Sequence, residues 1–224
     1  MKTYLKPLLV VSMLSTIASA ELVKTYFKTG ELKAATNYVD GTNTKIKKGI
    51  KNGVEKVYYQ IGKLANEVNY VKNQRDGKMT WYHKKGWVIK TLNYDLGKLV
   101  GAETTFYKSG KIKDSAFYKN NMREGDKKSF FRNGQLASIV NYTHGKKEGV
   151  QKEYFEDGKL FTQVTYKNNY KEGTQKWYDE NGKVINTIFY KMDRPVKIMK
   201  KVQETDHSQV KITNIDFSPQ KMRD

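Results

Sequence analysis

The chain has 224 residues, a formal net charge of +19, 12% aromatic residues and no cysteine. The lack of cysteine excludes disulfide bonds, thiolate metal sites, thiol catalysis and the lipid-bearing cysteine of a bacterial lipoprotein. A positive charge of this size favours a polyanionic partner, such as nucleic acid, anionic lipid, acidic polysaccharide or an acidic protein. Because lysines are interleaved with acids along strands, as in KNNMREGDKKSF, a solvated charged face is the favoured alternative to a dedicated anion site.

The first predicted element is a signal peptide at residues 1–20. Lys2 and Lys6 precede an apolar stretch, and Ala18-Ser19-Ala20 supplies the small residues of a cleavage site. The stretch is too short to be a comfortable membrane span, and no later segment is apolar for long enough to cross a bilayer. We therefore expect an exported chain, periplasmic or secreted, with a net charge of about +17 after cleavage, and we expect no nucleic acid partner.

Residues 21–194 are predicted to be an array of seven copies of a unit of about 24 residues. One glycine marks every copy: Gly30, Gly62, Gly86, Gly110, Gly134, Gly158, Gly182. An aromatic residue stands four positions before each of them: Tyr26, Tyr58, Tyr82, Phe106, Phe130, Tyr154, Tyr178. An aliphatic residue follows two positions after it: Leu32, Leu64, Val88, Ile112, Leu136, Leu160, Val184. A tyrosine follows eight positions after it: Tyr38, Tyr70, Tyr94, Tyr118, Tyr142, Tyr166, Tyr190. A second glycine closes the unit: Gly53, Gly77, Gly101, Gly125, Gly149, Gly173. The first two copies are separated by a loop insertion, GTNTKIKK, within residues 39–52.

Each copy contains two turn signals and no room for a helix. Dipeptides such as Asn133-Gly134 end at the marking glycine, and pairs such as Asn120-Asn121 follow eleven residues after it. Both signals predict two-residue type I′ hairpins, because both central residues of that turn need positive φ. The fold class is therefore all-β, an elongated, twisted antiparallel meander of β-hairpins with about fourteen strands. The aromatic and tyrosine columns are predicted to be core.

The second glycine column lies within a strand, where glycine normally weakens pairing. An idealised register places Gly77 beside Val68 and Tyr94. We hypothesise that glycine makes room for the tyrosine ring there or marks a bulge that redirects the strand.

The repeat decays after Tyr190, because Pro195 enters and Lys197 replaces the second glycine. Proline at this point is typical of an edge strand that ends an array. Residues 195–224 are predicted to be a C-terminal cap or tail, with an alternating stretch from Val210 to Phe217 that is either a capping strand or a loosely attached end.

The segment GVQKEYFEDGKLFTQVTYKNNYKEG, Gly149 to Gly173, resembles the MORN repeat, in particular its bacterial MORN-2 variant. The resemblance implies an elongated sheet of hairpins, no catalytic activity, and binding or scaffolding of phospholipids or protein partners. Bacterial arrays of this type are often labelled antitoxin-like, although a cytoplasmic antitoxin would not need a signal peptide. The family has no catalytic residue that could be transferred to this chain.

The residues themselves predict no catalytic, metal or cofactor site. His83, His144 and His207 are far apart, and the sequence holds no nucleophile elbow or phosphate loop. An acidic column before the second glycine is interpreted as local ion pairing between strands: Asp76, Glu124, Glu148, Glu172. The more variable column after the first aromatic is the predicted partner face: Phe27, Tyr59, His83, Tyr107, Phe131, Phe155.

These features predict an exported, non-enzymatic binding or scaffolding module for a protein partner or an anionic envelope surface. The alternative is an antitoxin or immunity-type protein that neutralises a toxin. A structural spacer that contacts only other copies of itself also remains open.

Overall fold

The computed structural model describes residues 20–39, 49–200 and 214–216. The predicted signal peptide up to residue 19, the inserted loop residues 40–48, and tail residues 201–213 and 217–224 lie outside the described residues.

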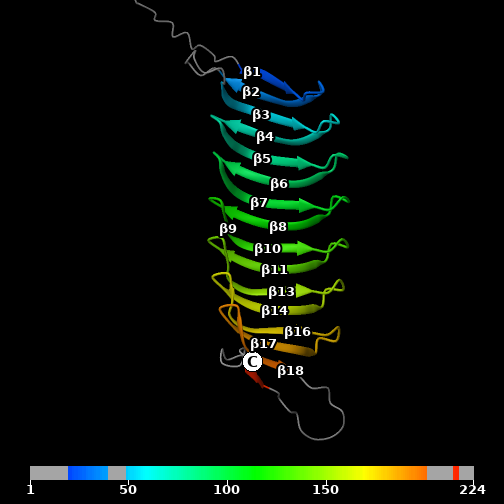
Figure 1. Cartoon of the computed structure of the whole chain (residues 1–224), viewed down its shortest axis with the longest axis vertical. Coiled ribbons are helices and arrows are strands. Elements are labelled where there is room, and N and C mark those ends of the chain that lie inside the picture. The colour runs from blue at the N-terminus through cyan, green and yellow to red at the C-terminus, as the bar shows by residue number, and fades with distance from the viewer. Residues whose placement is uncertain (1–19, 40–48, 201–213, 217–224) are drawn as a thin grey trace, which may run out of the picture.

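The described residues form one sheet of nineteen antiparallel strands (Figure 1), and this part of the chain contains no helix. The first eight strands are β1 (Ala20–Tyr26), β2 (Leu32–Val39), β3 (Ile50–Tyr58), β4 (Leu64–Val71), β5 (Gln74–Tyr82), β6 (Val88–Asp95), β7 (Lys98–Phe106) and β8 (Ile112–Lys119). The next eight are β9 (Met122–Arg123), β10 (Gly125–Phe130), β11 (Leu136–Thr143), β12 (Lys146–Lys147), β13 (Gly149–Tyr154), β14 (Leu160–Lys167), β15 (Tyr170–Lys171) and β16 (Gly173–Tyr178). The last three are β17 (Val184–Lys191), β18 (Arg194–Lys200) and β19 (Asn214–Asp216).

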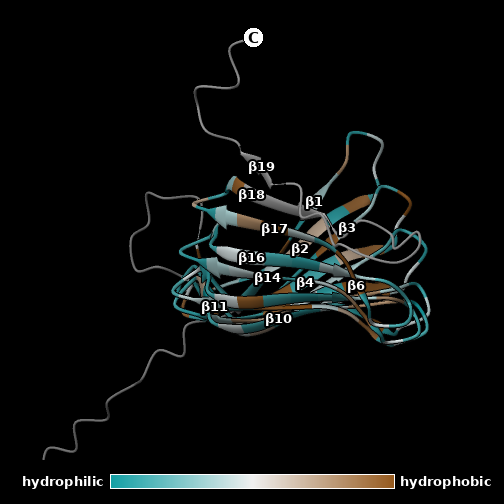
Figure 2. Ribbon diagram, turned by 90° about the horizontal axis from the view of Figure 1, so that it is seen from below, coloured by the Kyte–Doolittle hydropathy of each residue, from teal (hydrophilic) through white to brown (hydrophobic). Residues whose placement is uncertain are grey.

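Strands pair in chain order, so the sheet is a meander. The short strands β9, β12 and β15 are the first parts of strands that continue as β10, β13 and β16, because both parts pair with the same neighbour. Viewed along the array, strands near its two ends run in different directions (Figure 2), as expected for a twisted sheet. The predicted fold class, an elongated meander of hairpin repeats, is confirmed.

The turn at the marking glycine has a different conformation from the predicted type I′ hairpin. In the fifth copy, the Phe131 amide donates to the Gln135 carbonyl at 2.8 Å and the Gly134 amide donates to the Phe131 carbonyl at 2.9 Å. Gly134 has φ +99°, whereas Asn133 is not among the residues with positive φ. The loop therefore has three residues, a type I turn closed by a left-handed glycine, and only the glycine needs positive φ. The first hairpin, β1–β2, closes in the same way through Phe27, Gly30 and Glu31.

The second turn is the predicted type I′ hairpin. Both central residues have positive φ, for example 49° at Asn120 and 68° at Asn121. Successive turns are joined into a ladder by hydrogen bonds. The Asn121 amide donates to the Leu99 carbonyl at 2.9 Å, and the Leu99 amide donates to Asn121 Oδ1 at 2.7 Å. We call this long edge of the sheet the ladder rim and the opposite edge, formed by the three-residue loops, the loop rim.

The acidic column stabilises the ladder rim and does not form the predicted ion pairs. Each carboxylate accepts a hydrogen bond from the first residue of the next type I′ turn: Leu96 to Asp76 at 3.3 Å, His144 to Glu124 at 2.9 Å, Asn168 to Glu148 at 2.9 Å, Met192 to Glu172 at 3.0 Å. No ion pair among the described residues includes these acids. The prediction was wrong because an amide of the next turn lies closer to each carboxylate than any lysine head group.

The second glycine column marks a bend, and it does not make room for tyrosine. Gly77 pairs with Tyr94 as predicted, but a Cβ added at Gly77 or Gly125 would find no atom within 4 Å. Both glycines have φ +77°, and the pairing register shifts beside them. Of the two hypotheses, the bulge is therefore correct and the steric one is wrong.

The bend at this column gives the sheet a concave face. In a straight strand, residues four apart lie about 13 Å from each other. Lys51 Nζ nevertheless lies 2.6 Å from Glu55 Oε1, with Gly53 between them. The strand therefore turns toward the face that carries both side chains, near the rim at the left of Figure 1.

The most buried side chains lie on the concave face, six positions after the marking glycine. This column is not one of those predicted to be core: Val68, Leu92, Ala116, Val140, Val164. The predicted aromatic and tyrosine columns are mostly half-buried, and Tyr142 alone among them reaches full burial. The buried column and the tyrosine column are two residues apart and share this face. The buried column pairs with residues nearer the strand centre, such as Glu55 and Met79, whereas the tyrosines pair with the glycines at the bend.

The C-terminal end continues beyond the predicted edge strand. Pro195 pairs with Tyr190 in β18, and β18 in turn pairs with β19 through Lys197–Met199. Part of the alternating stretch of the tail, Asn214–Asp216, is thus a strand of the sheet.

Candidate functional site

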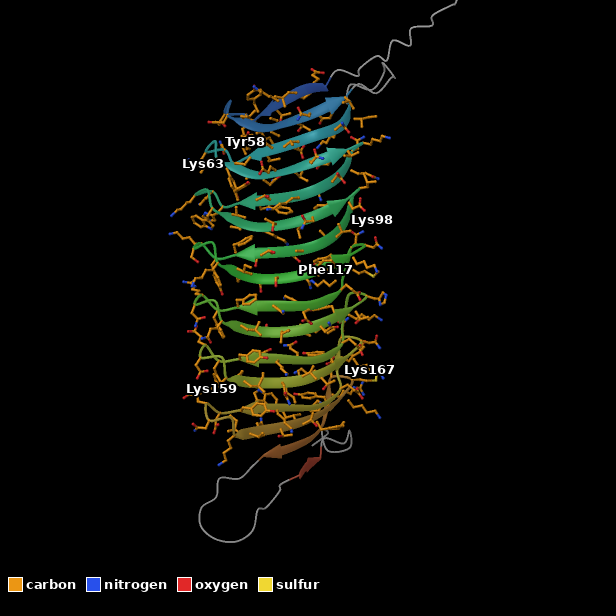
Figure 3. The ribbon with its side chains drawn as sticks, turned by 180° about the vertical axis from the view of Figure 1, so that it is seen from behind. Tyr58, Lys63, Lys98, Phe117, Lys159 and Lys167 are labelled. Atoms are coloured by element: carbon orange, nitrogen blue, oxygen red, sulfur yellow. The ribbon has the colours of Figure 1, made fainter. Side chains whose placement is uncertain are left out.

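The sheet offers two rims and two faces for contact with a partner. Figure 3 shows Lys63 and Lys159 on the loop rim and Lys98 and Lys167 on the ladder rim. Phe117 is 52% exposed and projects from the face opposite the concave one, which we call the convex face. Each repeat contributes to all four surfaces. A binding site confined to one part of a surface must therefore come from sequence differences between copies.

Four successive loops of the loop rim form a strongly basic patch, which we call the basic loop patch. It consists of residues 60–63, 84–87, 108–111 and 132–135. These loops carry cations and no carboxylate: Lys63, Lys84, Lys85, Lys108, Lys111, Arg132. All six of these side chains are exposed. The flanking loops each contain an acid: Glu31 before the patch, and Glu156, Asp157 and Glu180 after it.

Apolar side chains lie among the cations of this patch. Ile61 is 66% exposed at the tip of its loop. Trp87 occupies a position that the other copies fill with Lys, Glu or Gln, and it stacks on His83 with ring centroids 3.9 Å apart. Lys108 Nζ lies 5.5 Å from the centre of the Trp87 ring. Trp87 itself is half-buried. An exposed aliphatic side chain and a partly exposed indole among lysines are typical of surfaces that contact an anionic lipid interface.

The predicted partner face lies directly behind the loops of this rim. All six of its residues are half-buried: Phe27, Tyr59, His83, Tyr107, Phe131, Phe155. Their amides close the three-residue loops, and two of their hydroxyls bind the next copy. Tyr59 Oη donates to the Tyr82 carbonyl at 2.8 Å and Tyr107 Oη to the Phe130 carbonyl at 2.6 Å. The row thus has a bracing role in the sheet, and its contact with a partner stays a prediction.

The N-terminal half of the concave face holds paired charges. Lys51 pairs with Glu55, which also accepts a hydrogen bond from Thr36 at 3.0 Å, and Lys90 pairs with Glu103. Burial alone would raise the pKa of Glu55, but the bonds from Lys51 and Thr36 outweigh it and the net shift is downward. The pKa of Glu103 is lowered in the same way, since the Lys90 and Tyr118 bonds outweigh burial.

The C-terminal half of this face repeats the cations without the acids. Gln151 and Gln175 stand where Glu55 and Glu103 stand in earlier copies. Lys147 Nζ contacts Gln151 Oε1 at 3.0 Å, and Lys171 Nζ contacts Gln175 Oε1 at 3.0 Å. Burial, followed by the charge of nearby Lys127, lowers the pKa of Lys147. A neutral amide has thus replaced the carboxylate beside each lysine.

Tyrosine rings alternate with these cations along the bend. Lys147 Nζ lies 4.5 Å from the ring centre of Tyr166, and Lys171 Nζ lies 4.8 Å from that of Tyr190. Arg123 lies between Tyr118 and Tyr142, 5.6 and 5.5 Å from their ring centres. Such contacts stabilise a half-buried cation without neutralising it.

The paired acids predict a loss of stability in acid. Because folding lowers the pKa of Glu55 and Glu103, their stabilising contribution is complete above the unfolded pKa of about 4.3 and is lost as pH falls through the folded values. We expect the midpoint of thermal unfolding to be steady from pH 7 to 5 and to fall below that. A Glu55→Gln/Glu103→Gln variant should have a lower midpoint at pH 7 and a flatter acid limb. Glu156→Gln, on an exposed loop, is the control; equal slopes for the two variants would contradict the assignment.

Neither a metal site nor a membrane-spanning helix is found among the described residues. His83 stacks on Trp87, while His144 lies in a type I′ turn with φ +50°. His207 lies outside the described residues. Neither the basic loop patch nor the unneutralised lysines were predicted. Four consecutive loops without an acid are visible in the sequence, whereas the unpaired lysines can be recognised only once the bend is known.

Comparison with known proteins identifies the repeat. The family profile described as "MORN repeat variant" matches residues 51–72, 75–96, 99–120, 123–144, 147–168 and 171–192, more than half of the chain. A search of curated proteins finds no significant match. Among solved structures, a chain of the Photorhabdus luminescens Tc holotoxin pore is similar at 10% identity and a TM-score of 0.19. The alignment covers 83% of this chain but only 11% of that one. A similarity at this level carries no conclusion about function.

Proposed function

Because the chain belongs to the MORN repeat variant family, whose members are generally non-enzymatic binding modules, we propose that it is an exported, non-catalytic module that binds an anionic envelope surface. The contact surface is the basic loop patch. One observation carries the proposal: four adjacent loops hold six exposed cations and no carboxylate, while the flanking loops of the same rim contain acids.

The geometry of the rim suits a broad, flat surface. The four loops follow one another along the same edge of the sheet (Figure 3), so their cations lie side by side on one rim. Each lysine or arginine near an anionic bilayer contributes about 1 kcal/mol, and Ile61 and Trp87 supply apolar contacts at the same level. The predicted signal peptide would deliver the chain to the envelope.

The test is co-sedimentation of residues 21–224 with anionic and with neutral vesicles across a salt series. We expect binding to anionic vesicles alone, weakening steeply as salt screens the charges. Neutralising four patch lysines, Lys84→Gln/Lys85→Gln/Lys108→Gln/Lys111→Gln, should weaken binding at least about tenfold. The matched control removes four charges from the ladder rim: Lys98→Gln/Lys119→Gln/Lys146→Gln/Lys167→Gln. This control should retain most of the binding.

Equal losses in the two variants would show that total charge, and not the patch, determines binding. If the protein binds neither kind of vesicle, the proposal of an anionic surface is wrong and a protein partner is favoured. In that case, a pull-down from envelope and culture fractions separates a resident envelope protein from a toxin. Capture of a toxin whose activity is then inhibited would support the immunity-type alternative.

A further inference from the structure

The concave face contains cations that the protein does not neutralise. Within the described residues, no carboxylate oxygen lies within 4.0 Å of the Lys147 or Lys171 ammonium group. Glu153, whose charge acts on Lys147, accepts a hydrogen bond from Gln151 at 2.6 Å. Earlier copies show that the same position can hold a carboxylate, since Glu55 pairs with Lys51. The C-terminal copies therefore lack an anion for which the fold has a place.

This cation row is too recessed for a flat surface and suits a narrow chain. Both lysines are half-buried beside the bend, in contrast to the exposed lysines of the loops. Tyr142, Tyr166 and Tyr190 line the row on the same side of the sheet. Aromatic rings that line a binding surface are a common way to bind a polyproline II segment.

The distance between successive cations of the row distinguishes a polyproline II helix from a β-strand as the bound conformation. Lys147 and Lys171 occupy the same position in successive copies, and one copy spans two strands, about 9.6 Å. A polyproline II helix repeats every three residues with a rise of about 9.3 Å. An acid at every third residue therefore meets one cation per copy. A β-strand presents same-side residues about 6.7 Å apart and falls out of step after one copy.

We propose that the C-terminal half of the concave face binds an extended acidic polypeptide in polyproline II conformation, with carboxylates three residues apart bound by Lys147 and Lys171; Arg123, the next cation of the row, already lies 4.0 Å from Glu103. The half-buried rings of Tyr166 and Tyr190 pack against the intervening residues. This site is separate from the basic loop patch, and the two can be occupied or lost independently.

The probe is a fluorescein-labelled peptide in which Glu-Pro-Pro is repeated four times, with binding followed by fluorescence anisotropy. We expect it to bind at least about tenfold more tightly than an isomer with its four glutamates in one block, because only the first matches the spacing of the row. A Gln-Pro-Pro peptide should not bind. Equal binding of the two acidic isomers would overturn the proposed spacing, and tighter binding of an acidic polysaccharide would overturn the proposed class of ligand.

Variants at this site use the pattern of the chain itself. Gln151→Glu/Gln175→Glu restores the carboxylates found at Glu55 and Glu103 in earlier copies. The new carboxylates would pair with Lys147 and Lys171 and compete with the peptide, so peptide affinity should fall about tenfold or more. Lys147→Gln/Lys171→Gln should do the same. Lys146→Gln/Lys167→Gln removes the same charge from the ladder rim and should change affinity less than about threefold.

Folding is checked for each variant by its thermal midpoint. Gln151→Glu adds an ion pair with Lys147 but loses the hydrogen bond to Glu153, and Gln175→Glu places a carboxylate at a buried position. A loss of peptide binding by these variants is therefore assigned to the site only at temperatures well below their measured thermal midpoint. If these variants bind the peptide as tightly as the unmodified chain, the site is wrong. Vesicle binding by the same variants should be unchanged, which separates failure of this site from failure of the basic loop patch.

Discussion

Replacing Leu92 with alanine is expected to lower the free energy of unfolding by about 2–4 kcal/mol. Leu92 is 7% exposed on the concave face and pairs with Met79, which is 5% exposed. Removing the side chain loses its transfer free energy and leaves a cavity between neighbouring copies. The sheet has a single layer there, so no second layer can move in to fill the space. The measurement is the urea midpoint followed by circular dichroism.

Ile61→Ala is the matched control for this prediction. Ile61 is 66% exposed at a loop tip, and truncation there should change stability by less than about 0.5 kcal/mol. If both truncations have equal effects, the concave column is not the core of the array.

Replacing Gly125 with valine is expected to destabilise the protein by about 1–3 kcal/mol, although no atom blocks the new side chain. The cost comes from the backbone, because Gly125 has φ +77° and a β-branched residue rarely adopts that conformation. The thermal midpoint should fall by roughly 2–4 °C for each kcal/mol lost.

An asparagine at the same position separates strain from steric clash. Asparagine tolerates the left-handed region, so Gly125→Asn should be clearly milder than Gly125→Val although its side chain has similar bulk. If the asparagine variant is as unstable as the valine variant, a steric clash and not backbone strain explains the loss of stability. If neither is destabilised, the bend does not depend on glycine.

The sequence alone identified the repeat, the all-β meander and the type I′ turns of the ladder rim. These features depend on residues close together along the chain. A pair such as Asn120-Asn121 favours positive φ wherever it occurs, and a period of 24 residues is visible without any structure. The other turn was mistaken because Asn133-Gly134 suits either hairpin, and the choice depends on how the flanking Phe131 and Gln135 pair.

The sequence could not show which contacts join one copy to the next. The Glu124 carboxylate binds the amide of His144, twenty residues away, and no local pattern distinguishes that contact from an ion pair. Of the two candidate surfaces, one is visible in the sequence and the other is not. The sequence shows that four successive loops contain no acid. It does not show that Lys147 and Lys171 have no carboxylate within ion-pair distance, because that depends on how the strand bends.

The order of residues therefore determined the period, the strands and the family of this protein, because turn conformation and strand alternation are set by near neighbours. Only the tertiary structure decided which face is concave, which column is buried and which lysines lack an acid. The reason is the bend at the second glycine column: it brings residues four apart, such as Lys51 and Glu55, into contact, and a straight strand would keep them apart.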